Sequence, residues 1–258
     1  MLLAFDLDKT LLTDSYELPA DIARAVKAAR AAGHLVTVLT GRALAAAAPY
    51  LDALEIDLPH SVNHGSMIRE PNGAVIRRLQ LRSDEVRGLL DRHYQDLDIE
   101  FTCVIGETIY VRDPEHERWE WAHTANRAID RYLPGGDRDA DKVVFHANGR
   151  SDQMDALVAA EYPYLLRYLW GDGYLEVVPE GGDKGTALER IASLLKVRRE
   201  DVVAFGDGLN DVTMLQWAGR AVAVGPDVDP RALAAADEHI AAPEDGGVAD
   251  WIARFALR

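Results

Sequence analysis

Short apolar runs and amphipathic stretches alternate through the first and last parts of the chain. Residues 2–5 and 35–39 are mostly apolar runs bounded by turn-forming residues, a pattern typical of buried strands. A stretch of helical composition follows each run; Pro19 opens the first of these stretches and Gly33 closes it. The same order returns later, with helices predicted at 186–195 and 247–255 and strands at 202–205 and 221–224. Strands that alternate with helices over short connections predict a doubly wound α/β fold with a mainly parallel sheet.

The middle of the chain has a different pattern, in which strands come in adjacent pairs. Two β-rich runs at 99–104 and 108–111 flank Gly106-Glu107, which is a hairpin signal. A helical stretch at 152–161 is accompanied by further strands at 142–146, 164–170 and 174–178. We therefore predict an α+β domain at residues 83–180, inserted into a core formed by residues 1–82 and 181–258.

Composition narrows the range of functions. The 258 residues include 28 Lys and Arg against 43 Asp and Glu, which gives a formal net charge of −15. Such a charge disfavours nucleic-acid and membrane partners, since binding to phosphates and to anionic lipid depends on Lys and Arg. No run suits a signal peptide or a membrane-spanning helix, so we expect a cytoplasmic protein. The single cysteine, Cys103, excludes an intrachain disulfide.

Two carboxylates follow the first predicted strand. Asp6 and Asp8 lie two residues apart on an extended chain, so their side chains face the same way at the carboxyl end of the strand. Ligands of open α/β sheets bind at that edge. Two close carboxylates favour a bound cation or a shared proton. A solvated acidic turn is the alternative interpretation of this pair taken alone.

A second acidic cluster follows the predicted strand at 202–205. In the segment Gly206-Asp207-Gly208-Leu209-Asn210-Asp211 the glycines permit a sharp turn, and Asp211 lies one helical turn beyond Asp207. Taken alone, Asp207 would also suit the cap of the following helix. Two acidic clusters at the ends of two strands of one sheet predict a cation site instead, and Mg²⁺ prefers such oxygen ligands.

Two further segments carry groups that suit an anion. Thr40-Gly41-Arg42 follows the predicted strand at 35–39, where a hydroxyl and backbone N–H groups form either an anion site or an ordinary helix cap. Lys184 stands at the start of a predicted helix, where its charge opposes the helix dipole. Anion binding explains this lysine, and a solvated surface position is the alternative.

These four segments, in this order, resemble the motifs of the haloacid dehalogenase (HAD) superfamily, and most closely those of the Cof-type phosphatases of subclass IIB. Asp6-Leu7-Asp8-Lys9-Thr10 is similar to the first motif, Thr40-Gly41-Arg42 to the second, Lys184-Gly185 to the third and residues 206–211 to the fourth. Asn63-His64-Gly65, residues 176–179 and the tail at 235–248 are also similar. The resemblance implies a Rossmann-like core whose inserted α+β domain is a cap.

The resemblance also implies a reaction and a cofactor. Asp6 would be the nucleophile that forms an aspartyl-phosphate, and Asp8 would be the general acid and base. Mg²⁺ would be held by an Asp6 oxygen, the backbone carbonyl of Asp8 and Asp207, with Asp211 close enough to take part. The residues that would bind the phosphate are Thr40, Gly41, Arg42, Lys184 and Asn210.

The sequence departs from the family pattern at three places. Lys9 stands where glycine is usual, and we expect it to affect only the loop. His64 interrupts the usual Asn-Gly step, on what we expect to be the substrate side. Residues 225–227 stand where a Gly-Asn-Ala step is common, so no role is assigned to them.

The predicted cap is the only large element available to recognise the leaving group, and its candidate residues are His123, His146, Arg112, Trp119 and Trp121. The predicted substrate is a small phosphorylated metabolite, with a sugar phosphate as the first choice. Pyridoxal phosphate, flavin mononucleotide and nucleotides are alternatives, as is a phosphatase or phosphomutase specific for phosphoglycolate, sucrose phosphate or mannosylglycerate phosphate. A catalytically idle binding protein is disfavoured because the carboxylates and Lys184 are all present. A monomer or homodimer is expected.

Overall fold

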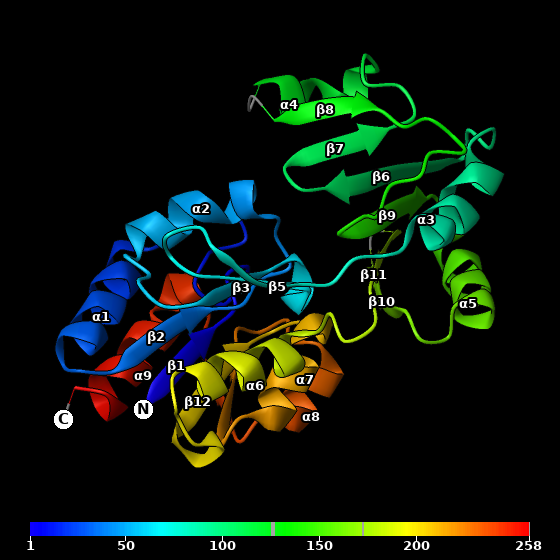
Figure 1. Ribbon diagram of the computed structural model, residues 1–258. Coiled ribbons are helices and arrows are strands. Elements are labelled where there is room, and N and C mark those ends of the chain that lie inside the picture. Colours follow the sequence, from blue (N-terminus) through cyan, green and yellow to red (C-terminus); the bar gives the residue numbers. More distant parts are fainter. Residues whose placement is uncertain (125–126, 172, 258) are drawn as a thin grey trace. The chain divides into compact units, whose positions relative to one another are not determined.

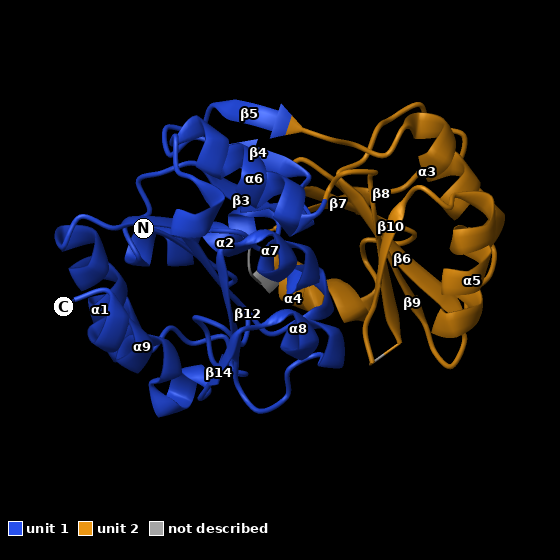
Figure 2. Cartoon of the chain, turned by 90° about the horizontal axis from the view of Figure 1, so that it is seen from below, with its two compact units in different colours: residues 1–77, 183–258 blue, residues 78–182 orange. Residues whose placement is uncertain are grey.

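The computed structural model describes residues 1–124, 127–171 and 173–257, and the chain divides into two compact units. Unit 1 comprises Met1–Arg77 and Asp183–Arg258, and unit 2 is the continuous segment Arg78–Gly182 (Figure 2). The chain passes between units at 77/78 and 182/183, whereas the predicted domain boundaries lie at 82/83 and 180/181. Each unit has its own sheets and its own apolar core.

The main sheet of unit 1 is parallel throughout, in the strand order β14-β13-β12-β1-β2, and Figure 1 labels β12, β1 and β2 of this sheet. Its strands are β1 (Leu2–Phe5), β2 (Leu35–Val38), β12 (Val202–Gly206), β13 (Arg220–Val224) and β14 (Glu238–Ile240). The first strand of the chain therefore lies inside the sheet, between β2 and β12. Parallel strands buried on both faces read as continuous apolar runs, as β1 and β12 do.

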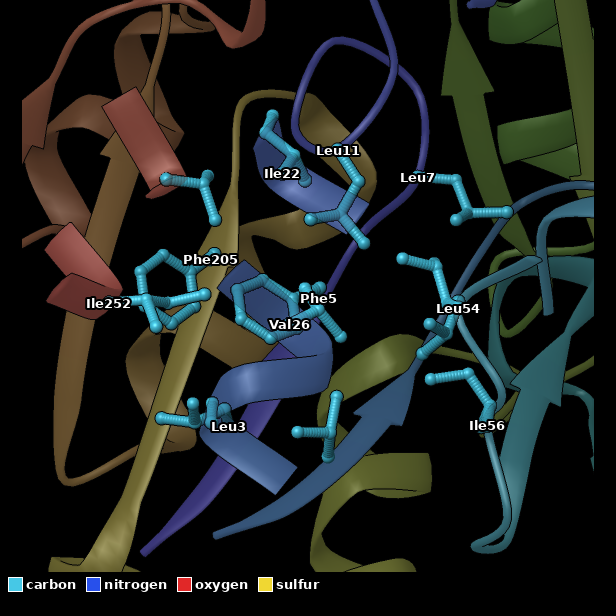
Figure 3. Packing of buried hydrophobic residues seen from close by; sticks show 14 of the residues in the cluster. Leu3, Phe5, Leu7, Leu11, Ile22, Val26, Leu54, Ile56, Phe205 and Ile252 are labelled. Atoms are coloured by element: carbon cyan, nitrogen blue, oxygen red, sulfur yellow. The ribbon is translucent and has the colours of Figure 1, made fainter. Parts of the chain in front are cut away.

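Helices cover both faces of this sheet. They are α1 (Ala20–Ala31), α2 (Leu44–Ala53), α6 (Lys184–Leu194), α7 (Val212–Trp217), α8 (Pro230–Ala235) and α9 (Gly247–Phe255). Alternate residues of β1 belong to different cores: Leu3 and Phe5 pack with residues of α1 and α9 (Figure 3), while Leu2 and Ala4 pack with residues of α6 and α7. The doubly wound α/β prediction is confirmed.

A small second sheet in unit 1 was not anticipated from the sequence pattern. Its strands run in the order β3-β4-β5, with bounds β3 (His60–Val62), β4 (Met67–Arg69) and β5 (Val75–Arg78). A 3₁₀ turn at Asn63–Gly65 connects β3 to β4. Leu39 and Ser61 form a parallel bridge, so the end of β3 lies beside the segment that follows β2.

Unit 2 is built on a six-stranded sheet in the order β10-β11-β9-β6-β7-β8. The strands are β6 (Ile99–Ile105), β7 (Thr108–Val111), β8 (Ala128–Arg131), β9 (Lys142–Ala147), β10 (Leu166–Leu169) and β11 (Tyr174–Val178). All neighbours are antiparallel except β7 and β8. The β6–β7 pairing confirms the predicted hairpin.

The helices that accompany the sheet in the described part of unit 2 are α3 (Ser83–Leu90), α4 (Glu120–Thr124) and α5 (Ser151–Glu161). Residues of α3 and α5 pack with alternate residues of β6 and β9, such as Phe101 and Phe145, in one apolar core. The intervening residues of these strands, Glu100 and His146 among them, lie on the opposite face. Unit 2 therefore has the α+β composition that the sequence indicates.

Several element ends differ from the predictions by one or two residues. Pro19 precedes α1 instead of opening it, β2 ends at Val38, and α6 begins at Lys184 instead of Thr186. The strand predicted at 164–170 is limited to Leu166–Leu169. Within the described part of the chain, no helix has both the length and the apolar character needed to cross a membrane.

Candidate active site

The carboxyl ends of β1 and β12 bring the first and fourth sequence motifs to one edge of the main sheet. Phe5 and Phe205 pair in parallel register, and the N–H of Asp6 donates to the carbonyl of Phe205 at 3.0 Å. Asp207 directly follows β12, and the hydroxyl of Thr10 donates to its Oδ1 at 3.1 Å. The topology thus brings two acidic segments together, although Thr10 and Asp207 lie 197 positions apart in the sequence.

Lys184 is the cation among these carboxylates. Its side chain is fully buried, and its Nζ lies 2.6 Å from Oδ1 of Asp6 and 2.5 Å from Oδ1 of Asp211. Lys184 is the first residue of α6, whose cap is Asp183; the Asp183 carboxylate accepts from the N–H of Thr186 at 2.9 Å. Two ion pairs therefore offset the unfavourable position of a lysine at a helix start.

Asp211 forms an ion pair with Lys184 through one carboxylate oxygen and hydrogen bonds to the backbone turn through the other. Its Oδ2 accepts hydrogen bonds from the N–H groups of Asp207 at 3.0 Å and Gly208 at 2.8 Å. A Cβ on Gly206 would lie 2.5 Å from Cγ of Asp211, so this turn has no room for a side chain there. Asp211 therefore fixes the position of both the lysine and the loop that carries Asp207.

Negative charge exceeds positive charge in this cluster, because three carboxylates share one lysine. Burial raises the pKa of Asp6 well above its usual value, Lys184 acts in the opposite direction, and the neighbouring carboxylates raise it further. Burial and the Asp211 carboxylate raise the pKa of Asp207 to about 7. Burial would lower the pKa of Lys184, but Asp211 and Asp6 raise it overall, so the lysine stays protonated. An additional cation would favour the ionised forms of Asp6 and Asp207.

The donor set fits a hard divalent cation. Single carboxylate oxygens of Asp6, Asp207 and Asp211 lie within 4.8 Å of one another. Oδ1 of Asp6 is buried and has the Lys184 charge beside it, yet it accepts no hydrogen bond of acceptable geometry from the described residues. A buried anionic oxygen with this deficit favours a metal ligand role, and carboxylate oxygens are the ligands that Mg²⁺ prefers. The side chain of Asp8 is not part of this group.

The Asp8 carboxylate is bonded instead to Arg42. The Nε of Arg42 donates to both Asp8 oxygens, at 3.1 Å and 2.9 Å, and the Nη2 donates to Oδ1. The guanidinium of Arg42 also lies 5.0 Å from the ring centroids of both Tyr16 and Tyr50. Fork-shaped pairing and aromatic stacking hold an arginine in one orientation. Arg42, predicted as a phosphate ligand, is therefore first of all the partner of Asp8.

Thr40 and Gly41 form the loop at the end of β2. Thr40 is fully buried, and its hydroxyl oxygen accepts from the N–H of Arg42 at 3.1 Å. Its own N–H donates to the carbonyl of Ser61 at 3.0 Å, which ties this loop to β3. A Cβ on Gly41 would lie 2.5 Å from Cε1 of His64. The structure thus packs the second motif directly against the segment that follows β3.

Lys9 keeps the backbone shape that glycine would adopt at this position. Its φ is +57°, in the left-handed region that favours glycine, and its Nζ lies 3.6 Å from Oδ1 of Asp14. Lys9 and Asp207 also line a cavity of about 240 Å³ in unit 1. The substitution at this motif position therefore changes the side chain and leaves the loop conformation in place.

The 3₁₀ turn at residues 63–65 contacts three of the four motifs. The N–H of Asn63 donates to the carbonyl of Arg42 at 2.8 Å, and the N–H of His64 donates to the carbonyl of Thr40 at 3.0 Å. The imidazole Nδ1 of His64 lies 3.2 Å from Nδ2 of Asn210. A Cβ on Gly65 would lie 2.1 Å from the carbonyl oxygen of Asp183, so the turn also abuts the start of α6. The unusual His64 noted in the sequence is a buried member of the site.

In unit 2 an aromatic cavity lies on the face of the sheet opposite α3 and α5. It has a volume of about 470 Å³ and is lined by Glu100, Phe101, Thr102, Arg118, Trp119, Trp121, Val144, His146 and Tyr174. The ring of His146 stacks on that of Tyr174 at 4.4 Å, and the guanidinium of Arg118 lies 5.3 Å from the Trp119 ring. Of the residues predicted to read the leaving group, His146, Trp119 and Trp121 line this cavity.

Arg112 and His123, the other two candidates, do not line the cavity. Arg112 donates to the carbonyls of Tyr94, His93, Asp96 and Ile99 and to the Glu100 carboxylate. Its side chain therefore fastens the loop before β6. His123 is exposed, and its Nε2 lies 3.0 Å from the carbonyl oxygen of Pro114. Their contacts indicate structural roles within unit 2.

Comparison with known proteins agrees with this arrangement. Residues 3–252 match the family described as haloacid dehalogenase-like hydrolases. The chain belongs to this family. The match extends over residues of both units of this HAD-like chain.

Relatives of this HAD-like chain include phosphatases of small phosphorylated metabolites. It is 26% identical to the 5-amino-6-(5-phospho-D-ribitylamino)uracil phosphatase YitU of Bacillus subtilis, over 98% of this chain and 97% of the relative. It is also 26% identical to the pyridoxal phosphate phosphatase YbhA of Escherichia coli, over 86% and 87%. The chain is accordingly a phosphatase of the HAD-like family.

A solved structure confirms the fold. The HAD subclass IIB sugar phosphatase BT4131 superposes on this chain with a TM-score of 0.82 and 21% sequence identity, covering 100% of this chain and 99% of that one. At this identity the likeness concerns the fold: a Rossmann-like core with an inserted α+β domain.

Proposed function

We propose that this phosphatase is Mg²⁺-dependent and hydrolyses a small phosphorylated metabolite through an aspartyl-phosphate intermediate. The main support for the proposal is the cluster of Asp6, Asp207 and Asp211 around Lys184. Its carboxylates outnumber the lysine, so a further cation would stabilise the cluster. Mg²⁺, held by Asp6, Asp207, the Asp8 carbonyl and Asp211, would supply positive charge to these carboxylates and to the incoming phosphate.

Asp6 is the proposed nucleophile. Its carboxylate oxygen attacks phosphorus, and the bond from phosphorus to the leaving oxygen breaks as the acyl-phosphate bond forms. Lys184 lies 2.6 Å from Oδ1 of Asp6 and offsets the repulsion between carboxylate and phosphate. Thr40, Gly41, Arg42 and Asn210 are proposed to complete the phosphate site with hydroxyl, amide, guanidinium and carboxamide donors.

Asp8 is the proposed general acid and base. It gives a proton to the departing oxygen, and in the second step it takes a proton from the water that attacks phosphorus and frees Asp6. The two-pronged hydrogen bond from Arg42 fixes the direction in which the Asp8 carboxylate points. Arg42 therefore contributes to catalysis through Asp8 in this proposal.

The experiment is release of phosphate from an aryl phosphate with and without chelator. We expect excess chelator to abolish turnover and added Mg²⁺ to restore it. Asp6→Asn should abolish turnover even with Mg²⁺, because the nucleophile is lost. Asp52→Asn, which changes an exposed carboxylate of α2, serves as the matched control. Activity in excess chelator would contradict the metal assignment, and wild-type kcat in Asp6→Asn would contradict the covalent mechanism.

Asp8→Asn separates the two carboxylates of the first motif. We expect it to be slow with alkyl phosphates and less impaired with a nitrophenyl ester, whose leaving group needs no proton. A uniform loss for both esters would assign Asp8 a role other than proton transfer.

For the substrate, we propose a sugar phosphate first, with its organic part recognised by unit 2. The aromatic cavity of unit 2 favours a second candidate, a phosphate ester that carries a planar heteroaromatic ring. His146, Tyr174, Trp119 and Trp121 offer ring faces, and Arg118 and Glu100 offer polar groups at the same cavity. The relatives named for pyridoxal phosphate and for a phosphoribitylamino-uracil support this candidate.

A substrate panel distinguishes the two candidates. Hexose phosphates, pyridoxal phosphate and flavin mononucleotide are compared by kcat/KM, with a nitrophenyl ester as the reference. Preference for the ring-bearing esters that is lost in Trp121→Ala would support the second candidate. Phosphate released from hexose phosphates alone would support the first, and conversion to a phosphorylated isomer would indicate a phosphomutase. A cytoplasmic location and a monomeric or homodimeric state stand as predictions.

A further inference from the structure

We propose that His64 is a positioning residue for catalysis, which orients the carboxamide of Asn210 toward the phosphate. The proposal rests on the proposed phosphatase function and adds a residue to which the sequence resemblance gives no role. It begins with an unusual backbone. Asn63 and His64 have φ values of +50° and +61°, and both side chains are buried, with 1% and 2% of their surface exposed.

Side chains other than glycine rarely adopt this left-handed conformation. Strain of this kind is retained where the surrounding structure holds it in place, and it is concentrated at functional sites. Here the surrounding structure is the site itself. The N–H of His64 donates to the carbonyl of Thr40, and Gly65 lies against the backbone of Asp183, next to Lys184. The backbone therefore directs the imidazole between the second and fourth motifs.

The imidazole occupies a space that a neighbouring residue leaves open. A Cβ on Gly41 would lie 2.5 Å from Cε1 and 2.9 Å from Nδ1 of His64, so any side chain at position 41 would displace the ring. On its other side, Nδ1 of His64 lies 3.2 Å from Nδ2 of Asn210. The ring is thus packed between Gly41 and Asn210, both of which are proposed phosphate ligands.

The contact with Asn210 has a direction. A carboxamide nitrogen can only donate, so Nδ1 of His64 is the acceptor and, in the neutral ring, Nε2 carries the proton. The Oδ1 of Asn210 points the other way, since a Cβ on Gly208 would lie 2.8 Å from it. With the carboxamide fixed in this way, we assign its second N–H to a phosphate oxygen. Without the acceptor on His64, the carboxamide can rotate and turn its oxygen toward the phosphate.

The chain permits an unusually clean test, because glycine suits the backbone of residue 64. His64→Gly removes the imidazole and at the same time relieves the left-handed strain, which offsets part of the packing that is lost, so we expect the variant to fold. We expect kcat/KM for a nitrophenyl ester to fall tenfold or more, since one misdirected donor at a phosphate site has an effect of this size or larger. The melting temperature is measured in parallel.

A second variant restores the acceptor without the ring. In His64→Asn the side-chain oxygen takes the place of Nδ1, and asparagine tolerates a positive φ. Activity should return to within about threefold of the wild type. Lys196→Gly is the matched control: Lys196 is exposed, and its φ of +57° is relieved by the same change. Its kcat/KM should equal that of the wild type.

Coupling to Asn210 is the readout that a purely structural role would not produce. The double variant His64→Gly with Asn210→Ala should be no slower than Asn210→Ala alone, because His64 acts through the carboxamide. Multiplied losses in the double variant would overturn the proposal. So would wild-type kcat/KM in His64→Gly, or a His64→Asn variant as slow as His64→Gly.

The test separates this inference from the proposed function. Inorganic phosphate binding in the presence of Mg²⁺ is measured by calorimetry for the wild type and for His64→Gly, and we expect the variant to bind at least tenfold more weakly. Turnover in the wild type with unchanged phosphate affinity in His64→Gly would refute only the role of His64. A wild type that neither binds phosphate nor releases it from any ester would refute both.

Discussion

The two units treat their buried charges differently. In unit 2 the buried Asp141 carboxylate accepts from Nε and Nη2 of Arg78, at 2.7 Å and 2.8 Å, and from the N–H of Gly106 at 2.7 Å. Among the described residues, the positive charge of Arg78 and three N–H donors thus stabilise this single carboxylate. In unit 1, Asp6, Asp207 and Asp211 share Lys184.

This difference separates structure from function. A buried ion pair whose charges balance can serve folding alone, whereas an unbalanced cluster is costly unless a ligand completes it. Unit 1 has such an unbalanced cluster at the carboxyl edge of its parallel sheet. The excess of carboxylates over cations therefore marks the active site more clearly than the number of carboxylates or their burial does.

The largest effect should follow from removing the shared lysine. Lys184→Met leaves Asp6 and Asp211 buried without a cation, so the free energy of unfolding should fall by about 3–5 kcal/mol and turnover should cease. Lys142→Met in unit 2 is the matched control, because Lys142 forms an ion pair with Glu176 at 2.9 Å and this pair lies nearer the surface. Urea unfolding measures the free energy of unfolding of both variants. Equal losses in the two variants would contradict the distinction between the units.

Neutralising one carboxylate in each unit should have opposite effects. Asp141→Asn removes the partner of Arg78, and the free energy of unfolding should fall by about 2–3 kcal/mol. Asp6→Asn, in the absence of Mg²⁺, should leave stability unchanged or raise it, because the raised pKa of Asp6 shows that its ionised form is disfavoured. Thermal melting with a chelator present tests the pair, and a loss in Asp6→Asn as large as that in Asp141→Asn would refute the expectation.

Two substitutions in unit 2 should separate fold maintenance from recognition. Arg112→Ala removes several hydrogen bonds to backbone carbonyls, so it should lower stability by about 1–3 kcal/mol and affect all substrates alike. His146→Ala alters the aromatic cavity and should change kcat/KM by up to roughly tenfold, unequally among substrates. Steady-state kinetics across the panel and melting temperatures give the two readouts. A uniform drop in His146→Ala would assign this residue to folding as well.

The smallest expected effect is the slow alkylation of the Cys103 thiol in the native protein. Burial raises the pKa of this thiol to about 12, so little reactive thiolate is present at pH 8. Iodoacetamide should therefore label the native protein very slowly and the urea-unfolded protein readily, as mass spectrometry would show. Cys103 lies in the core of unit 2, so its labelling reports the opening of that unit alone. Rapid labelling of the native protein would contradict the packing described around it.

The sequence indicated the fold where the pattern was long and strongly apolar. The runs at β1 and β12 and the helix α9 were anticipated with their bounds correct to within a residue. The strands β3, β4, β5, β8 and β14 were missed because they have three or four residues and carry polar or charged side chains. Such strands are defined by their pairing partners, which local pattern does not contain.

The candidate site divides in the same way. Strand ends and helix starts could be located from the sequence, and these place Asp6, Asp207 and Lys184 at one edge. The pairing of Arg42 with Asp8 depends on side-chain directions inside two loops, which spacing does not specify. His64 could be singled out as a departure from the family pattern, but its contact with Asn210 joins segments 146 positions apart. The catalytic roles of these residues stay predictions until the variants are measured.

The central position of β1 has a consequence for the order in which the protein matures on the ribosome. β1 pairs with β2 on one side and with β12, some two hundred positions later, on the other. Unit 2 is one continuous segment and can fold as soon as it emerges, whereas unit 1 stays an open half-sheet until β12 has been synthesised. Lys184, Asp207 and Asp211 arrive on the same late segment. The phosphatase therefore gains its reactive centre only with the final third of the chain, and a nascent chain stalled before that point is inactive.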